Sequence, residues 1–119
     1  MLCDISYNII RSDYMPYDGG PMTEAMYYVL LALVHPSHGY QLMNEIEEVS
    51  KGRVKMGPGT LYGVLSRLMK DELITVVNDD GRRKTYSITE DGISVLKIEY
   101  NRLMSMVNDG IIIKEGNYE

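Results

Sequence analysis

Apolar positions recur at intervals of three and four residues in four segments of the chain, and this period predicts four helices. The helices are expected over residues 23–34, 39–50, 58–72 and 89–110. Thr23 and Thr89 suit the N-cap positions of the first and last helices, because a threonine hydroxyl accepts a hydrogen bond from a free backbone N–H. Pro36 stops the first helix, and Pro58 costs nothing at the start of the third.

A β-hairpin is expected between the third and the last helix. Residues 73–77 are rich in β-branched side chains, residues 78–82 have turn chemistry with Asp80-Gly81 inside, and residues 84–88 alternate between polar and apolar. The predicted order is helix, helix, helix, two-stranded hairpin, helix. This is the layout of a winged helix-turn-helix with an added C-terminal dimerisation helix, so we expect a mostly α fold with a small β-hairpin.

The apolar stripes of the second and third helices predict which side chains are buried. The predicted buried positions are Leu42, Met43, Ile46, Val49, Leu61, Val64, Leu65, Leu68 and Met69. Three glutamates of the second helix are expected to face solvent: Glu45, Glu47 and Glu48.

The first and last helices have apolar faces that predict a second subunit. One face of the first helix holds Met26, Val29, Leu30 and Leu33, and another holds Tyr27, Tyr28 and Leu31. A helix that is apolar nearly all round must be covered on both sides, and in a small domain the second cover can be another subunit. The last helix carries a heptad stripe of Ile93, Leu96, Tyr100, Leu103 and Val107. We therefore expect a homodimer built on these two helices.

The two ends of the chain differ from its middle. Residues 1–20 have no clear period and end in a cluster of Pro and Gly, so we interpret them as an N-terminal tail or an arm that packs on a partner subunit. The chain then divides into this segment, a winged helix-turn-helix domain over residues 21–89, and a dimerisation helix and tail over residues 90–119. The apolar run at residues 111–113 could dock on the body or on a partner.

The charge pattern favours a nucleic-acid interface despite a net charge of −5. Eight of the twelve basic residues lie in two windows, residues 51–70 and 82–84, although nearby glutamates could neutralise those at 51–55. The third helix begins with short side chains, which lets it approach DNA closely, and a major groove about 12 Å wide admits one helix. The candidate DNA-contacting residues are Tyr40, Lys55, Thr60, Tyr62, Ser66, Arg67, Arg82, Arg83 and Lys84.

Other classes of site are weakly indicated. Cys3 is the only cysteine, and His35 and His38 are separated by Pro36, so we expect neither a metal nor a cofactor. No glycine-rich phosphate loop follows a strand, and no Ser-His-Asp or Cys-His set is apparent, so we do not expect an enzyme. The start does not read as a signal peptide, and the longest apolar run is about half of the ~20 residues that span a bilayer, so we expect a cytoplasmic protein without membrane contact.

Residues 22–95 resemble PadR-type transcriptional regulators. The matching segments are Tyr28-Val29-Leu30-Leu31-Ala32-Leu33, His38-Gly39-Tyr40-Gln41-Leu42, Gly59-Thr60-Leu61-Tyr62, Leu65-Ser66-Arg67-Leu68, Gly81-Arg82-Arg83-Lys84 with Tyr86, and Ile88-Thr89-Glu90-Asp91-Gly92. The resemblance implies a dimeric repressor that binds duplex operator DNA, with the last helix paired against the first helix of the other subunit. Three positions depart from the family pattern. Gly63 stands where the family often has Pro, Glu72 stands where it usually has Gly, and Thr85 stands where it often has an aromatic residue.

The short C-terminal part resembles the family subgroup that has a single C-terminal helix. Some members of that subgroup bind small aromatic or drug-like molecules between the subunits, which makes Tyr28, Tyr100 and Met104 candidate ligand contacts. The leading hypothesis is a sequence-specific DNA-binding regulator, a repressor released by a small-molecule or stress signal. The alternative is a protein-interaction adaptor that uses the winged helix only as a scaffold.

Overall fold

The computed structural model describes residues 20–116. Its elements are α2 (Glu24–Ala32), β1 (Ser37–His38), α3 (Gly39–Val49), α4 (Pro58–Lys70), β2 (Ile74–Asp79), β3 (Lys84–Ile88), α5 (Glu90–Asp109) and α6 (Ile111–Glu115). They confirm the predicted mostly α fold with a hairpin. The proposed arm over residues 1–20 lies outside the described residues except for Gly20, and so do Cys3 and residues 117–119.

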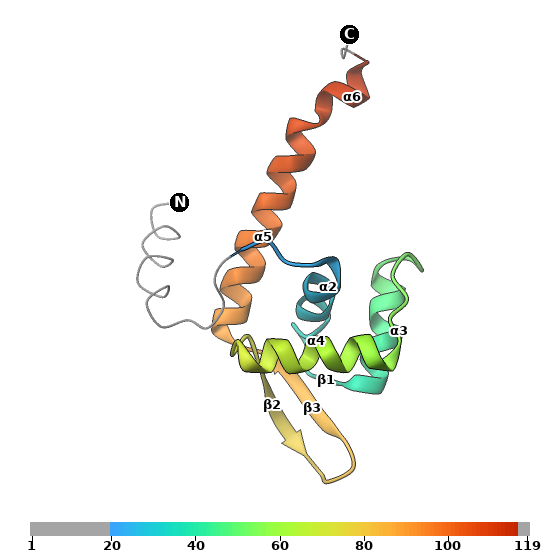
Figure 1. Cartoon of the computed structure of the whole chain (residues 1–119), viewed down its shortest axis with the longest axis vertical. Coiled ribbons are helices and arrows are strands. Elements are labelled where there is room, and N and C mark those ends of the chain that lie inside the picture. Colours follow the sequence, from blue (N-terminus) through green and yellow to red (C-terminus); the bar gives the residue numbers. More distant parts are fainter. Residues whose placement is uncertain (1–19, 117–119) are drawn as a thin grey trace.

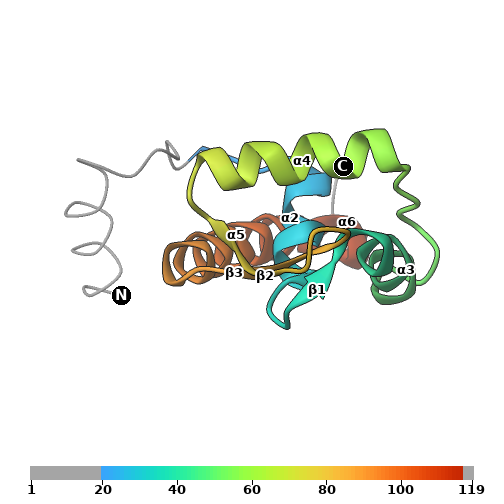
Figure 2. The ribbon, with the colours of Figure 1, turned by 90° about the horizontal axis from the view of Figure 1, so that it is seen from below.

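The helices α2, α3 and α4 pack with the sheet into one body, from which α5 extends on one side and the β2–β3 hairpin on the other (Figure 1). Figure 2 shows α4 running along one side of this body, with α2 packed behind it and α3 and α5 toward opposite ends. The core consists mainly of aliphatic side chains from these helices, β2 and the first half of α5. Its fully buried members are Val29, Leu30, Leu33, Leu42, Ile46, Leu61, Leu65, Leu68 and Leu73.

Local capping explains where the helices begin. The Thr23 hydroxyl accepts the Met26 N–H at 3.1 Å, and the Thr89 hydroxyl accepts the Gly92 N–H at 3.0 Å, as predicted for N-caps. The first helix is shorter than expected, because Leu33 already caps its end. The third helix ends at Lys70 and is continuous through Gly63, so this departure from the family pattern leaves the helix intact.

Three predicted positions in the helix stripes are wrong. Val49 is 49% exposed and Met69 is 38% exposed, although Ile46 and Leu68 in the same last turns are fully buried, so each exposed residue lies at the border of its apolar stripe. Glu45 does not face solvent freely: its Oε1 is buried, with no hydrogen-bond partner among the described residues. The apolar period thus identifies the centre of each buried stripe correctly and fails at the borders of the stripe.

The sheet has three antiparallel strands in the order β1-β3-β2. The short strand β1 was not predicted; it pairs Ser37 with Tyr86 and His38 with Thr85. The hairpin is also longer than predicted, because Asp79 still pairs with Lys84 and a bulge between Val76 and Asn78 shifts the register. The turn is therefore restricted to residues 80–83, where Gly81 has a φ of 88°.

The helix α5 is covered by the body only along its first half. Val95, Leu96 and Glu99 are buried, whereas Tyr100 is 54% and Val107 is 66% exposed. After Gly110 the chain forms the short helix α6, whose residues 111–113 are exposed. This apolar run therefore does not dock on the body of its own chain. No helix within residues 20–116 combines the length and apolarity needed to cross a bilayer.

Candidate nucleic-acid interface

The helix α4 presents a polar face because its leucines fix the opposite face in the core. Leu61, Leu65 and Leu68 are fully or almost fully buried at spacings of three and four residues. Their burial leaves one set of predicted contact residues exposed on the same helix: Thr60, Tyr62, Ser66 and Arg67. Gly57 precedes the helix and Pro58 occupies its first turn, so no bulky side chain crowds this end.

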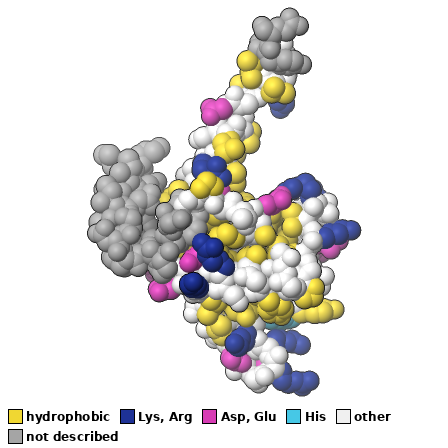
Figure 3. All heavy atoms as spheres, viewed as in Figure 1, with side chains coloured by type: hydrophobic (Ala, Val, Ile, Leu, Met, Phe, Trp, Pro, Cys, Tyr) yellow, Lys and Arg dark blue, Asp and Glu magenta, His cyan; other side chains and the backbone are white. Residues whose placement is uncertain are grey.

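The hairpin tip presents three cations, and its acidic residues build the turn that carries them. The Asp80 carboxylate accepts the backbone N–H groups of Arg82 and Arg83 at 3.0 and 2.9 Å, and these two hydrogen bonds lower the pKa of Asp80. The Asp79 carboxylate accepts the Gly81 N–H at 2.9 Å. The carboxylates thus bind backbone groups, while the side chains of Arg82, Arg83 and Lys84 are exposed. In Figure 3, Lys and Arg side chains (dark blue) project from the hairpin end of the molecule.

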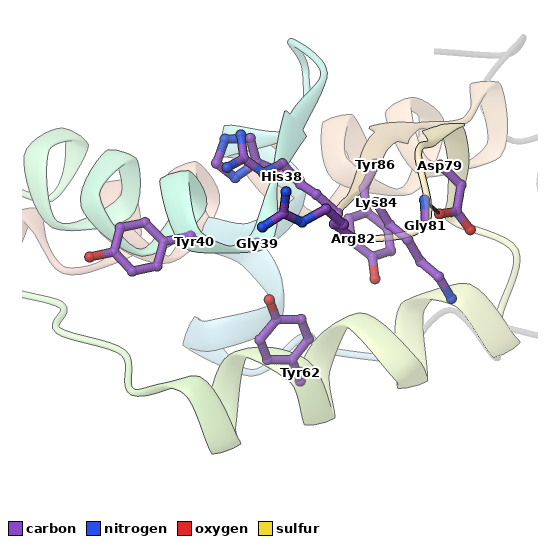
Figure 4. Close-up of a pocket in the computed structure, with 10 residues that line it drawn as sticks. His38, Gly39, Tyr40, Tyr62, Asp79, Gly81, Arg82, Lys84 and Tyr86 are labelled. Atoms are coloured by element: carbon purple, nitrogen blue, oxygen red, sulfur yellow. Dashed lines mark hydrogen bonds between the residues drawn. The ribbon is translucent and has the colours of Figure 1, made fainter.

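A groove of about 460 Å³ lies between α4, the start of α3 and the hairpin. It is lined by His38, Gly39, Tyr40, Tyr62, Asp79, Gly81, Arg82, Arg83, Lys84 and Tyr86 (Figure 4). The Tyr62 ring reaches from α4 to the start of α3, where any side chain at Gly39 would collide with the tyrosine hydroxyl. Burial raises the pKa of Tyr86, and the nearby Tyr62 and Asp79 add to this shift. Only one acid, Asp79, is among the lining residues.

The structure brings five of the nine predicted contact residues to this groove: Tyr40, Tyr62, Arg82, Arg83 and Lys84. Tyr40 is 73% exposed, so it lies at the surface of the groove and not in the core. Thr60, Ser66 and Arg67 lie on the neighbouring face of α4, and Lys55 lies in the preceding loop. Arg67 forms an ion pair with Asp71 at 2.8 Å, one helical turn further along.

Two side chains that line the groove, those of Tyr86 and His38, were not among the predicted DNA contacts. Tyr86 lies on β3, where its alternation with Thr85 and Ser87 predicted only a half-buried strand position. His38 belongs to β1, and its Nδ1 accepts the Gln41 N–H at 3.4 Å at the start of α3. Within residues 20–116 no group of three His, Cys, Asp or Glu residues is arranged to hold a metal ion.

The residues predicted to contact a second subunit lie on α2 and α5. Tyr27, Tyr28 and Leu31 are partly buried, and the rings of Tyr27 and Tyr28 meet edge to face at 5.9 Å. On α5, Ile93, Tyr100 and Val107 are exposed and Leu103 is partly buried. Leu96 belongs to the core of its own chain, which leaves four residues of the predicted heptad stripe at or near the surface.

The predicted ligand contacts lie beside this α2–α5 surface. Burial raises the pKa of Tyr27, and an electrostatic interaction with Tyr100 on α5, the helix that packs against α2, adds to this shift. Met104 is exposed one turn beyond Tyr100. The Tyr28 hydroxyl is already engaged, since it accepts a hydrogen bond from Arg53 at 2.6 Å.

Comparison with known proteins identifies what these features resemble. The sequence model described as "Transcriptional regulator PadR-like family" matches residues 29–98. The transcriptional regulator YqjI of Escherichia coli K12 is 33% identical over 75 residues, which are 63% of this chain and 36% of that protein. The chain spans from 28% to 64% of the length of the curated relatives that it matches.

Solved structures show the same fold. A PadR family transcriptional regulator from Eggerthella lenta superposes with a TM-score of 0.59 at 24% identity, over 92% of this chain and 87% of that one. The regulator PcaV from Streptomyces coelicolor, solved in complex with its natural ligand, gives a TM-score of 0.64 at 22% identity, over 90% and 75% of the two chains. The family and these neighbours are described as transcriptional regulators and not as enzymes.

Proposed function

Because the chain belongs to the PadR-like family of transcriptional regulators, we propose that it is a homodimeric, sequence-specific repressor that binds duplex operator DNA. The observation that carries this proposal is the groove between α4 and the hairpin, which is lined by Tyr62, by the three cations of residues 82–84 and by one acid, Asp79. Clustered cations of this kind bind the negatively charged phosphate backbone of DNA. The adjacent polar face belongs to a single helix, α4, and a major groove about 12 Å wide admits one helix.

The contacts divide into two kinds. The proposed base contacts are Thr60, Ser66 and Arg67, which are exposed on α4, and contacts to base edges specify the sequence. Phosphate contacts come from the hairpin and the rim of the groove, and they fix the register of the protein on DNA. The proposed phosphate contacts are Tyr40, Lys55, Tyr62, Arg82, Arg83 and Lys84.

Two copies of the chain pair through the exposed stripe of α5 and the tyrosine face of α2 in the proposed dimer. The incomplete cover of α5 supports this arrangement, since Tyr100 and Val107 expose apolar surface that a partner would bury. Each subunit then places one α4 in a major groove, and the two half-sites lie about 34–36 Å apart, which is one helical turn of DNA.

A small aromatic effector binding near Tyr28, Tyr100 and Met104 is the proposed release signal. The resemblance to PcaV, which was solved with its natural ligand, supports a search for such a molecule. An effector could release DNA only if it bound unequally to the DNA-bound and DNA-free arrangements of the subunits.

The adaptor alternative has less support from the arrangement of charges. The adaptor alternative would be favoured if acidic residues of α3 interrupted the basic surface formed by α4 and the hairpin tip. Instead, Glu47 and Glu48 line a different hollow together with Asn44, Lys51 and Gly52, at the opposite end of α3 from Tyr40.

The test is selection of binding sites from a random pool of duplexes, followed by fluorescence anisotropy with the selected duplex. Affinity should fall steeply between 50 and 200 mM salt, because phosphate contacts release counterions. Arg67→Ala should cost roughly 1–3 kcal/mol and relax specificity if Arg67 contacts a base, while Tyr62→Ala and Arg83→Ala, at proposed phosphate contacts, should weaken binding to selected and mixed sequences alike. Absence of any salt-dependent binding by the wild-type protein would contradict the proposal.

A further inference from the structure

Arg53 joins the loop before α4 to the start of α2. Its Nη1 donates to Glu24 Oε2 at 2.6 Å, and its Nη2 donates to the Tyr28 hydroxyl at 2.6 Å. The guanidinium carbon also lies 5.6 Å from the centre of the Tyr28 ring. Both ends of the guanidinium fork are therefore used inside the chain, even though the side chains of Arg53 and Glu24 are each more than half exposed.

The rest of this loop is held to α3 and to the core. The Gly52 N–H donates to the Glu47 carbonyl at 2.7 Å, and the Val54 N–H donates to the Ser50 hydroxyl at 2.9 Å. Met56 is buried immediately before α4 begins. Arg53 supplies the tie in another direction, to α2, so the segment leading into α4 is fixed from both neighbouring helices.

The hydrogen bond between Arg53 and Tyr28 connects the loop before α4 to the α2–α5 surface, on which the proposed dimer and effector contacts lie. Tyr28 receives Arg53 at its hydroxyl, and its ring meets that of Tyr27 edge to face. Tyr27 lies on α2, which packs directly against α5, the helix that carries Tyr100. A single tyrosine thus contacts both the loop that leads into the DNA-reading helix and the aromatic surface between α2 and α5.

We propose that Arg53 is a positioning residue of the DNA interface, which fixes the loop before α4 through Tyr28 and Glu24 instead of contacting DNA itself. This inference rests on the proposed DNA-binding function and deepens it. A ligand or subunit contact that drew the Tyr28 hydroxyl away from Arg53 would loosen the loop and weaken DNA binding. A contact at the Tyr28 hydroxyl is therefore expected to release DNA and not to strengthen DNA binding.

Substitutions separate a positioning arginine from a phosphate-contacting one. Tyr28→Phe removes only a hydroxyl, and Arg53→Lys keeps the charge while losing the two-pronged fork that spans Glu24 and Tyr28. If Arg53 positions the loop, each of these variants and Arg53→Ala should weaken binding about threefold to tenfold. The double variant Tyr28→Phe/Arg53→Ala should bind no more weakly than Arg53→Ala alone, because both changes remove the same connection.

The slope of affinity against salt gives the decisive readout. Anisotropy is measured with the full chain and the duplex selected from the random pool, at several salt concentrations. Arg53→Ala should leave the slope unchanged, since no counterion-releasing contact is lost, whereas a phosphate contact would lower it by about one. Lys55→Ala, at a proposed phosphate contact in the same loop, is the matched comparison and should lower the slope by about one, and a thermal melt confirms that each variant is folded.

Three outcomes would overturn the inference while leaving DNA binding in place. They are wild-type affinity in Arg53→Lys, wild-type affinity in Tyr28→Phe, and a reduced salt slope in Arg53→Ala. If the wild-type protein itself selects no sequence and shows no salt-dependent binding, the proposed function fails first and this inference fails with it. The two failures are therefore distinguishable by the behaviour of the wild-type chain alone.

Discussion

The two halves of α5 carry the same apolar period but meet different surroundings. In the first half Val95 and Leu96 are buried against the body, and in the second half Tyr100 and Val107 are more than half exposed. Burial of apolar surface is favourable by roughly 25 cal/mol per Å², so the first half of the helix supplies most of the apolar stabilisation that α5 gives the isolated chain. An apolar period therefore identifies a face for burial without indicating which molecule covers it.

The boundary between the two halves is marked by a buried charge. Glu99 accepts hydrogen bonds from Arg102 at 2.6 and 2.9 Å and from the Met22 N–H at 3.2 Å, and these partners lower the pKa of the carboxylate. The contact ties the segment before α2 to the middle of α5. Beyond this point the helix leaves the body (Figure 1).

The largest expected effect comes from the covered half. Leu96→Ala should lower the free energy of unfolding by about 3 kcal/mol, because it leaves a cavity in the core. Urea denaturation followed by circular dichroism measures this change. Met106→Ala, at an exposed position of the same helix, is the control, and a loss of equal size there would contradict the contrast between the two halves.

Substitutions in the exposed half of α5 should change the stability of the proposed dimer. Val107→Asp places a charge on the heptad stripe and should weaken the proposed dimer by about 2 kcal/mol, or roughly 30-fold, because the carboxylate would be desolvated between the subunits. Sedimentation equilibrium measures the dissociation constant. Ser105→Asp adds the same charge off the stripe and should leave the constant unchanged; equal behaviour of the two variants would place the interface elsewhere.

Lowering the pH should destabilise the chain at Glu99, which lies at the boundary between the two halves of α5. The pKa of Glu99 is lowered in the folded chain, so its stabilisation is present above the ordinary glutamate pKa and is lost as the pH falls through the folded value. Glu99→Gln should therefore cost roughly 1.5 kcal/mol at pH 7 and progressively less in acid. Urea titrations from pH 7 to pH 3 test this, and a difference that stayed constant with pH would exclude Glu99 as its source.

Local and periodic signals explain what the sequence could predict. The threonine caps and Pro58 act within one turn of a helix, and the buried leucines of α4 follow directly from the helical period. The strand β1 escaped prediction because its two residues pair with β3, almost fifty positions later, and contain no alternation of their own. The extent of the hairpin depends on a bulge, which changes the pairing without a distinct sequence signal.

The candidate interface shows the same division. The cluster at residues 82–84 and the exposed face of α4 were visible as charge and period, and the Arg67–Asp71 pair has the ordinary spacing of one helical turn. The contact of Tyr62 with the start of α3, and that of Arg53 with α2, join segments that are distant in sequence. Only the packing of the helices brings those residues together.

The smallest expected effect concerns the body alone, at the end of α4. Glu72 has a φ of 62°, in the left-handed region that disfavours a side chain with a Cβ, and it stands where the family pattern usually has glycine. Glu72→Gly should raise the free energy of unfolding by about 1 kcal/mol, whereas Glu72→Ala, which retains the Cβ, should gain little. Thermal melts measure the gain, and the dimer dissociation constant should not move, because Glu72 lies on the body and not on the exposed half of α5. A glycine variant no more stable than the alanine variant would mean that the left-handed conformation costs this chain nothing.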